Sequence, residues 1–247
     1  MTDKLMKYAC MLLAVVFLAG CKQYVYRPTT IKSTGFIAKN DFEFSVNFGN
    51  YAELHSAYAV TDHLAISGTL GYGGNRNDTT LNKDTTGNVV NTNIRNSKPR
   101  DNEISLGYFT NAGDNSSFEI FAGMGFAQRK FTNEFTDHLN SANNFERSGI
   151  DNRYRRLFIQ PAFGRNGKYI DVSIASRFTF ITYDLDNHTD FISETAFTTR
   201  IGYKNIKFMG QVGVRLYNVD SRYGYLPFYA GFGIYLQFNK AIRESSF

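Results

Sequence analysis

The chain has 247 residues, 16% of them aromatic, and its 27 Lys and Arg against 22 Asp and Glu give a formal net charge of +5. An excess of basic residues is typical of proteins that bind nucleic acid or a phosphate-bearing membrane surface. No other feature supports nucleic acid, so we expect lipid as the partner. The two Cys residues exclude a multi-disulfide scaffold, and the length suits one all-β domain.

The amino terminus is predicted to be an export signal. Lys4 and Lys7 precede an apolar run over residues 8–18, which is too short to cross a bilayer as a helix. Residues 18–21, Leu-Ala-Gly-Cys, resemble the lipobox of bacterial lipoproteins. That resemblance implies cleavage before Cys21 and a lipid on its sulfur; the alternative is an ordinary secretory signal with a chance Cys.

Four segments are therefore expected along the chain. They are a lipoprotein signal peptide (1–20), a lipid-anchored periplasmic leader (21–40), an outer-membrane β-barrel (41–238) and a short periplasmic tail (239–247). The leader is polar and contains Pro28 and Gly35. We expect it to be a tether or a periplasmic plug, mostly without regular structure.

Ten stretches alternate between apolar and small or polar residues, which predicts ten β-strands with two unlike faces. They cover residues 42–48, 51–60, 64–73, 103–110, 118–130, 153–163, 169–181, 195–203, 206–217 and 226–238. Strands with no helix between them need a closed sheet to remove their edges. The predicted fold is a single ten-stranded, antiparallel, up-and-down transmembrane β-barrel.

The connections between the predicted strands alternate in length. Long polar loops are expected at 75–101, 131–152 and 183–194, with a further loop at 218–225 and brief turns between them. Outer-membrane barrels have short periplasmic turns and long extracellular loops. An even strand count places both ends of the barrel at one face, which we expect to be the periplasmic face and the side of the lipid anchor.

A soluble barrel of lipocalin type also alternates, but its apolar face points inward. A solvated exterior is normally dense in Lys and Glu. Here the polar face carries mostly Gly, Ala, Ser and Thr, as a narrow interior requires, and the apolar face is nearly free of charge. The pattern therefore favours a membrane barrel with its apolar face toward lipid.

Three features together resemble uncharacterised outer-membrane β-barrel lipoproteins of Bacteroidota: the lipobox, residues 57–73 (AYAVTDHLAISGTLGYG) and the repeated aromatic strands. The resemblance covers nearly the whole mature chain and implies a fold and a membrane, but no particular activity. The last strand also resembles the terminal signal that the outer-membrane assembly machinery reads. Phe238 is expected to serve in that role, with Phe247 as the alternative.

The inward face carries charges in an ordered way. Acids come from the first five strands and bases from the sixth to the ninth, with one acid among the bases: Glu43, Glu53, Glu103 and Glu119, then Arg156, Arg177, Arg200, Lys207 and Arg215, with Asp171. Buried charges must be paired, so we predict ion pairs that cross and plug the lumen. The alternative is a transverse field lining a small passive pore.

Basic residues also meet where the fifth predicted strand ends and the sixth begins. By parity, Lys130, Arg153 and Arg155 point outward, and a guanidinium binds phosphate through two oxygens. We hypothesise that they contact lipid A phosphates; the alternative is a solvated girdle.

Catalysis is not expected. Omptin proteases, which are ten-stranded barrels, use Asp and His at the outer rim, and this chain has Asp184, His188 and Asp190 in one predicted loop and Asp137-His138 in another. Such residues in a polar loop are usually solvated, and no metal spacing, cofactor motif or nucleophile elbow is present.

We expect a structural or surface-interaction role through the loops, with outer-membrane lipid, lipopolysaccharide and the assembly machinery as partners. The alternatives are a small passive pore and then a rim hydrolase.

Overall fold

In the computed structural model, the described residues are 29–49, 51–73, 76–83, 89–113, 115–137, 145–185, 187–217 and 227–238, with the backbone alone in the stretches 76–97 and 131–150. They form eleven strands in an antiparallel sheet: β1 (Phe42–Phe48), β2 (Ala52–Ala59), β3 (Leu64–Tyr72), β4 (Arg76–Lys83), β5 (Val89–Gly113), β6 (Ser116–Asp137), β7 (Phe145–Arg165), β8 (Ile170–Tyr183), β9 (Thr189–Tyr203), β10 (Ile206–Tyr217) and β11 (Phe228–Phe238). Within this part of the chain, no helix has the length and apolar character to cross a membrane.

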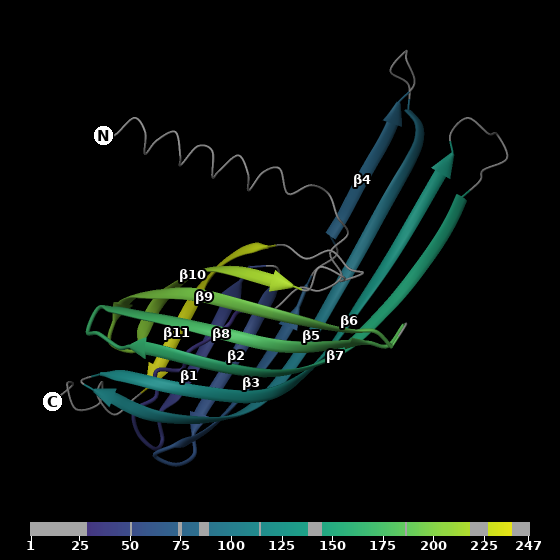
Figure 1. Ribbon diagram of the computed structural model, residues 1–247. Helices are drawn as coiled ribbons and strands as arrows, with labels where there is room; N and C mark the ends of the chain where they lie inside the picture. The colour runs from purple at the N-terminus through teal and green to yellow at the C-terminus, as the bar shows by residue number, and fades with distance from the viewer. Residues whose placement is uncertain are drawn as a thin grey trace, which may run out of the picture.

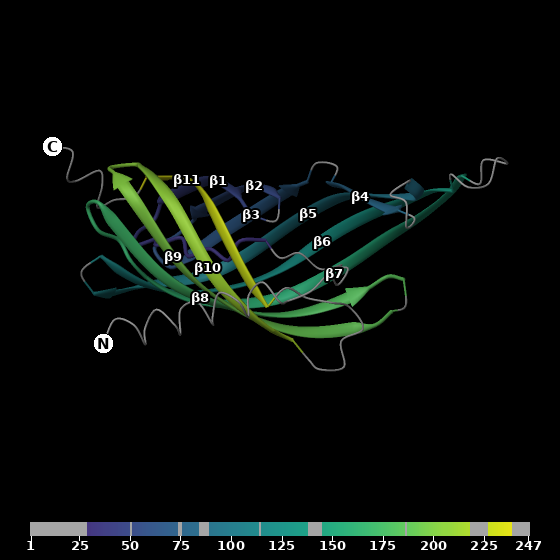
Figure 2. The same ribbon diagram turned by 90° about the horizontal axis from the view of Figure 1, so that it is seen from above.

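Ten of these strands close into a barrel, as the sequence predicts. β3 pairs directly with β5, and β1 pairs with β11, so the ring is complete without β4 (Figures 1 and 2). Aromatic rings support the closing seam on its outer side, where Phe42 stacks on Phe238 and Phe48 lies against Phe232 with centroids 5.7 Å apart. The predicted last strand begins at Phe228 rather than at residue 226.

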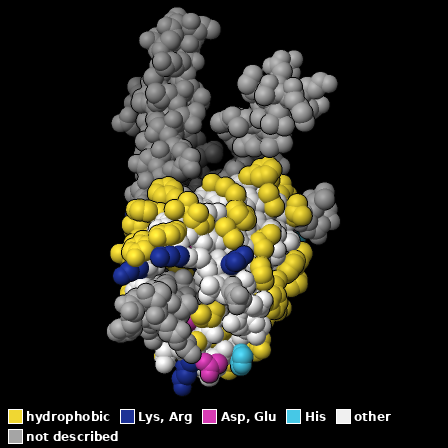
Figure 3. Space-filling view, turned by 90° about the vertical axis from the view of Figure 1, so that its left-hand side faces the viewer, with side chains coloured by type: hydrophobic (Ala, Val, Ile, Leu, Met, Phe, Trp, Pro, Cys, Tyr) yellow, Lys and Arg dark blue, Asp and Glu magenta, His cyan; other side chains and the backbone are white. Residues whose placement is uncertain are grey.

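The oily side chains face outward. Phe232 and Ile174 are 66% and 51% exposed, whereas Glu119 and Arg200 are 0% and 2% exposed. Hydrophobic side chains cover much of the wall in Figure 3, and the acidic and His side chains visible there gather at one end. This is the outer-membrane type of barrel and not the lipocalin type, because alternate residues present the apolar face to the surroundings.

Three strands are much longer than a membrane requires. A tilted membrane strand needs about 9–11 residues, but β5, β6 and β7 have 25, 22 and 21 residues. Their outer parts and β4 form a four-stranded sheet, which we call the arm, that projects from one end of the barrel (Figures 1 and 2).

The predicted long loops are therefore largely wrong. The stretch 75–101 contains β4 and the beginning of β5, and 131–152 contains the end of β6 and the beginning of β7. The third loop is also shorter than predicted, because β9 begins at Thr189. Alternation of apolar and polar residues is required only where one face of a strand meets lipid. It therefore ends where a strand leaves the membrane, although the hydrogen-bonded ladder between strands continues.

The opposite end of the barrel has only short connections, at 60–63, 114–115, 166–169 and 204–205. β1 begins and β11 ends at this same face, which we call the turn end. Residues 1–28, 218–226 and 239–247 lie outside the described residues, so Cys21, the signal peptide, the predicted tail and Phe247 do as well.

Candidate functional site: a lumen filled by the amino-terminal segment

The lumen contains a piece of the chain itself. Residues 29–36, which we call the plug segment, are all buried, and they run through the barrel without regular secondary structure. The sequence analysis assigned them to a leader that acts as a tether or a periplasmic plug; the structure places residues 29–36 inside the barrel. Nothing in the composition of this polar stretch indicates that a barrel encloses it.

The barrel holds the main chain of the plug segment at five consecutive carbonyls. Each carbonyl oxygen, from Ile31 to Gly35, accepts a hydrogen bond from a side chain on the wall. The donors are Gln211 to Ile31, Gln160 to Lys32, Arg200 to Ser33, Tyr235 and Gln237 to Thr34, and Asn166 to Gly35. An extended segment outside a sheet must satisfy its backbone groups elsewhere, and here four strands and one turn supply the partners.

Two acids hold the N–H groups of the same segment. Glu53 accepts from the amide of Thr30 at 3.0 Å, and Glu119 accepts from the amides of Thr34, at 2.8 Å, and Gly35. These carboxylates were predicted to pair with bases across the lumen. Instead Glu119 serves the backbone, and the cation beside Glu53 is Lys32 of the plug segment itself, at 3.5 Å.

Gly35 allows the plug segment to change direction near its carboxyl end, which lies toward the turn end of the barrel. Its φ of +63° lies in the left-handed region, and an added Cβ would meet the Asn166 side chain at 2.6 Å. Both conditions favour Gly. The next residue, Phe36, packs edge-on against Phe109 in an apolar cluster at the turn end.

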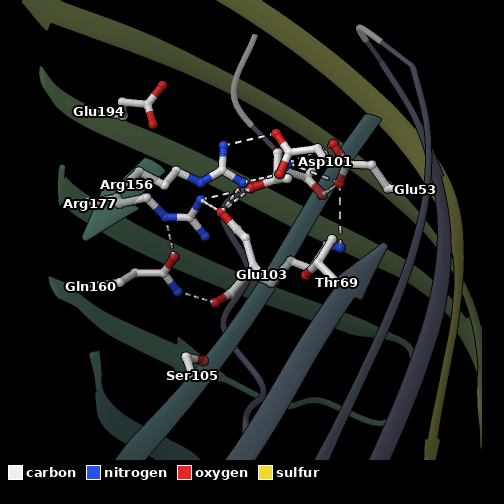
Figure 4. Close-up of polar contacts among 12 residues, drawn as sticks. Glu53, Thr69, Asp101, Glu103, Ser105, Arg156, Gln160, Arg177 and Glu194 are labelled. Atoms are coloured by element: carbon white, nitrogen blue, oxygen red, sulfur yellow. Dashed lines mark hydrogen bonds and ion pairs between the residues drawn. The ribbon is translucent and has the colours of Figure 1, made fainter. Parts of the chain in front are cut away.

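A buried ionic cluster near the arm contains contacts between acids of β5 and bases of β7 and β8. Arg156 of β7 binds Glu103, with 2.6 Å between Nη2 and Oε1, and also binds Asp101; Arg177 of β8 binds Glu103 at 3.0 Å. Figure 4 shows both guanidinium groups directed at the acids of β5. The plug segment joins this cluster because the Thr29 hydroxyl donates to Glu103 at 2.9 Å.

Other buried pairs differ from the prediction in their partners. Lys207 contacts Asp171 at 2.5 Å, and Arg215 contacts Glu194 at 2.6 Å. Glu194 was placed in a loop, so the prediction of Asp171 as the one acid on this wall is wrong. Residue 194 lies within β9, where its parity directs it inward.

Two further predicted lumen residues contact partners that are neutral or, in the case of His55, charged only when protonated. Glu43 contacts His55 at 2.7 Å and accepts from the Tyr235 hydroxyl at 2.6 Å. Arg200 stacks on Tyr235, with Cζ 3.9 Å from the ring centroid, besides donating to the plug segment. All ten predicted lumen charges thus lie inside the barrel, but they divide between ion pairs and contacts with the plug segment.

Several lumen residues were missed. Gln160, Gln211 and Gln237 sit at inward positions of predicted strands, so parity could have identified them. Asp101 was assigned to a loop and Lys32 to the leader, and the local sequence gives no signal for either. Around Lys32 and Arg177 a cavity of only about 20 Å³ remains, room for about one water molecule.

The predicted phosphate-binding residues do point outward at the arm end. Lys130, Arg153 and Arg155 are 61%, 63% and 62% exposed at their side chains. Asp151 lies 4.0 Å from Lys130 and 3.5 Å from Arg153, and Asp184 lies 3.4 Å from Arg155. Three cations and two carboxylates leave one positive charge in this group.

Of the acid and His residues of the predicted rim loop, one pair comes together and Asp184 stays apart from it. His188 contacts Asp190, with 2.9 Å between Nε2 and Oδ1, while Asp184 is engaged by Arg155 on the outer surface. Of the other predicted pair, His138 lies outside the described residues. No group of three or more His, Cys, Asp and Glu in the described ranges could hold a metal ion.

No protein-family model and no curated protein matches the chain. Among solved structures, the chain is similar to the outer membrane protease OmpT from Escherichia coli, with a TM-score of 0.47, 10% identity, and coverage of 80% of this chain and 92% of that one. It is also similar to in-vitro folded OmpT, an outer membrane protein of Vibrio cholerae, with a TM-score of 0.28, 8% identity, and coverage of 85% and 100%. These are likenesses of fold.

Proposed function

We propose that this protein is a closed outer-membrane β-barrel lipoprotein with a surface-interaction role, carried by the arm. The observation that supports this role most strongly is the continuation of β5, β6 and β7 as paired strands beyond the barrel. A paired sheet holds a binding surface in a fixed shape, which a flexible loop does not. Short turns at the other end correspond to the periplasmic side of outer-membrane barrels, so the arm faces the cell exterior.

A closed lumen supports an interaction role over a pore. The plug segment occupies the barrel, with side chains from several strands bound to its main chain, and the neighbouring cavity of about 20 Å³ has room for about one water molecule. Transport through this lumen would require removal of at least five hydrogen-bonded carbonyls from their donors.

The arm role is tested by replacing residues 76–97 and residues 131–150 each with a short Gly-Asn turn, which removes β4 and the outer parts of β5, β6 and β7. The deletion must stop before Asp101, because that residue binds Arg156 inside the barrel. Cells that carry the wild type or the variant are compared for adhesion to cultured epithelial cells, adhesion to cells of the same bacterium, and phage adsorption. We expect a folded, heat-modifiable barrel that has lost binding in at least one assay; a folded variant equal to wild type in all three would contradict the proposal.

We propose a second contact, between lipid phosphate groups and the outward-facing Lys130, Arg153 and Arg155 on the barrel wall. The triple variant Lys130→Ala, Arg153→Ala, Arg155→Ala is expected to retain less lipopolysaccharide on purification than wild type does. Asp151→Asn is the matched control, since removing the shared carboxylate should raise retention. Equal retention in all three proteins would refute this contact.

A further inference from the structure

The direction of the plug segment determines which end of the barrel the preceding chain leaves. At its carboxyl end, the segment leads into residues anchored at the turn end: the amide of Lys39 donates to Asp62 at 2.9 Å, and the amide of Asn40 donates to the carbonyl of Ala59 at 2.9 Å. Residues 60–63 form the short connection between β2 and β3. The segment therefore enters β1 from the turn end.

At its amino end, the segment has reached the other end of the wall. Thr30 binds Glu53, which is the second residue of β2 and pairs in register with Asn47, the last residue but one of β1. The preceding residue, Thr29, binds Glu103 in the cluster beneath the arm. Over residues 29–36 the chain thus descends from the arm end toward the turn end, antiparallel to β1.

We infer that the chain before Thr29 leaves the barrel through the arm end, so that the mature amino terminus lies on the cell surface and not in the periplasm. This inference rests on the proposed orientation of the barrel, and it reverses the side of the lipid anchor that the sequence predicted. Within the part of the chain that the structure describes, wall side chains bind the main chain of the plug segment, so a second pass of the chain through the barrel would have to displace these contacts.

Chain length excludes a return around the outside. Eight residues separate Cys21 from Thr29, and they span at most about 26–29 Å when fully extended. The hydrocarbon core is about 30 Å thick, and the path would first have to cross the rim. A lipid on Cys21 would therefore insert its acyl chains in the outer leaflet, beside the arm.

The test uses the full chain in the outer membrane of a Gram-negative host, with a membrane-impermeant maleimide as the probe. Gln23→Cys reports the amino terminus, Leu185→Cys reports the arm end, where residue 185 is 64% exposed, and Lys168→Cys reports the turn end. The unsubstituted chain, with Cys10 and Cys21, gives the background.

We expect Gln23→Cys to be labelled on intact cells to the same extent as Leu185→Cys, and Lys168→Cys to be labelled only after permeabilisation. The inference would be overturned if Gln23→Cys were labelled only under the condition that labels Lys168→Cys. It would also be overturned if Gln23→Cys were labelled neither on intact cells nor after permeabilisation. If Leu185→Cys were the protected site and Lys168→Cys the accessible one, the proposed orientation would fail, whereas Gln23→Cys tracking Leu185→Cys would still support the path of the segment.

Discussion

Two neighbouring residues on β7 show how the alternation of inward and outward positions along a strand determines the role of a charged side chain. Arg156 is 1% exposed and binds Asp101 and Glu103, whereas Arg155 lies on the opposite face, with its side chain 62% exposed and in contact with Asp184. Burial in the lumen removes most of the solvent that would otherwise stabilise an unpaired carboxylate. One guanidinium is therefore structural and the other is a surface group.

Arg156→Met should reduce the free energy of unfolding by about 3–5 kcal/mol, because it leaves two buried acids without a major partner. Arg155→Met should change it by at most about 1 kcal/mol, as expected for an exposed ion pair. Urea titrations in detergent, followed by the electrophoretic mobility of folded and unfolded barrel, measure both. Equal effects of the two substitutions would contradict the assignment of Arg156 to the lumen.

Glycines on the inner wall make room for large lumen side chains. A Cβ added at Gly107 would lie 2.4 Å from the ring of Phe121, but a Cβ at Gly210, which faces outward, would meet nothing within 4 Å. Overpacking of this kind costs about 1–3 kcal/mol. Gly107→Ala should therefore lower the urea midpoint, while Gly210→Ala should leave it unchanged or raise it; the reverse order would show that the two faces have been exchanged.

At the scale of elements, the plug segment behaves as an intramolecular ligand of the barrel. Its contacts are mostly to main-chain groups, with Ile31 and Phe36 adding apolar packing against small residues and Phe109. Because the wall recognises backbone, individual polar side chains of the segment should matter less than its presence.

Removal of the segment should open the lumen. A variant lacking residues 22–36 is expected to show channel events in planar bilayers, whereas wild type and Ser33→Ala are expected to show none, because the Ser33 carbonyl that Arg200 holds remains in the alanine variant. Conductance in wild type would refute closure by the segment, and so would a folded truncated barrel that does not conduct.

The sequence predicted well those elements that touch lipid. Alternation located all ten barrel strands and the outward direction of residues such as Phe232 and Ile174. It missed β4 and the outer ladder of β5–β7, since a backbone hydrogen-bonded ladder does not require the apolar alternation by which the sequence analysis located strands. It also missed the contents of the lumen, because most of the contacts that hold the plug segment are made to its main chain, which every sequence shares.

As a whole, the molecule has its apolar surface outside and its polar core inside. Lipid takes the place of a packed apolar interior around the wall, and the ordinary core is replaced by ion pairs and a captured length of chain. The arm adds a paired four-stranded sheet at one end, and the connections at the turn end are short.

The central claim is that residues 29–36 lie within the closed barrel, and a disulfide between the segment and the wall tests it most directly. A Cβ at Gly164 on β7 would lie 3.0 Å from the Ser33 hydroxyl, within reach of disulfide geometry. Mild oxidation of the Ser33→Cys, Gly164→Cys protein in membranes should give a disulfide-linked peptide pair by mass spectrometry, while Ser33→Cys, Gly210→Cys should give none. A folded Ser33→Cys, Gly164→Cys barrel that forms no cross-link, or equal cross-linking to the outward position 210, would contradict the account.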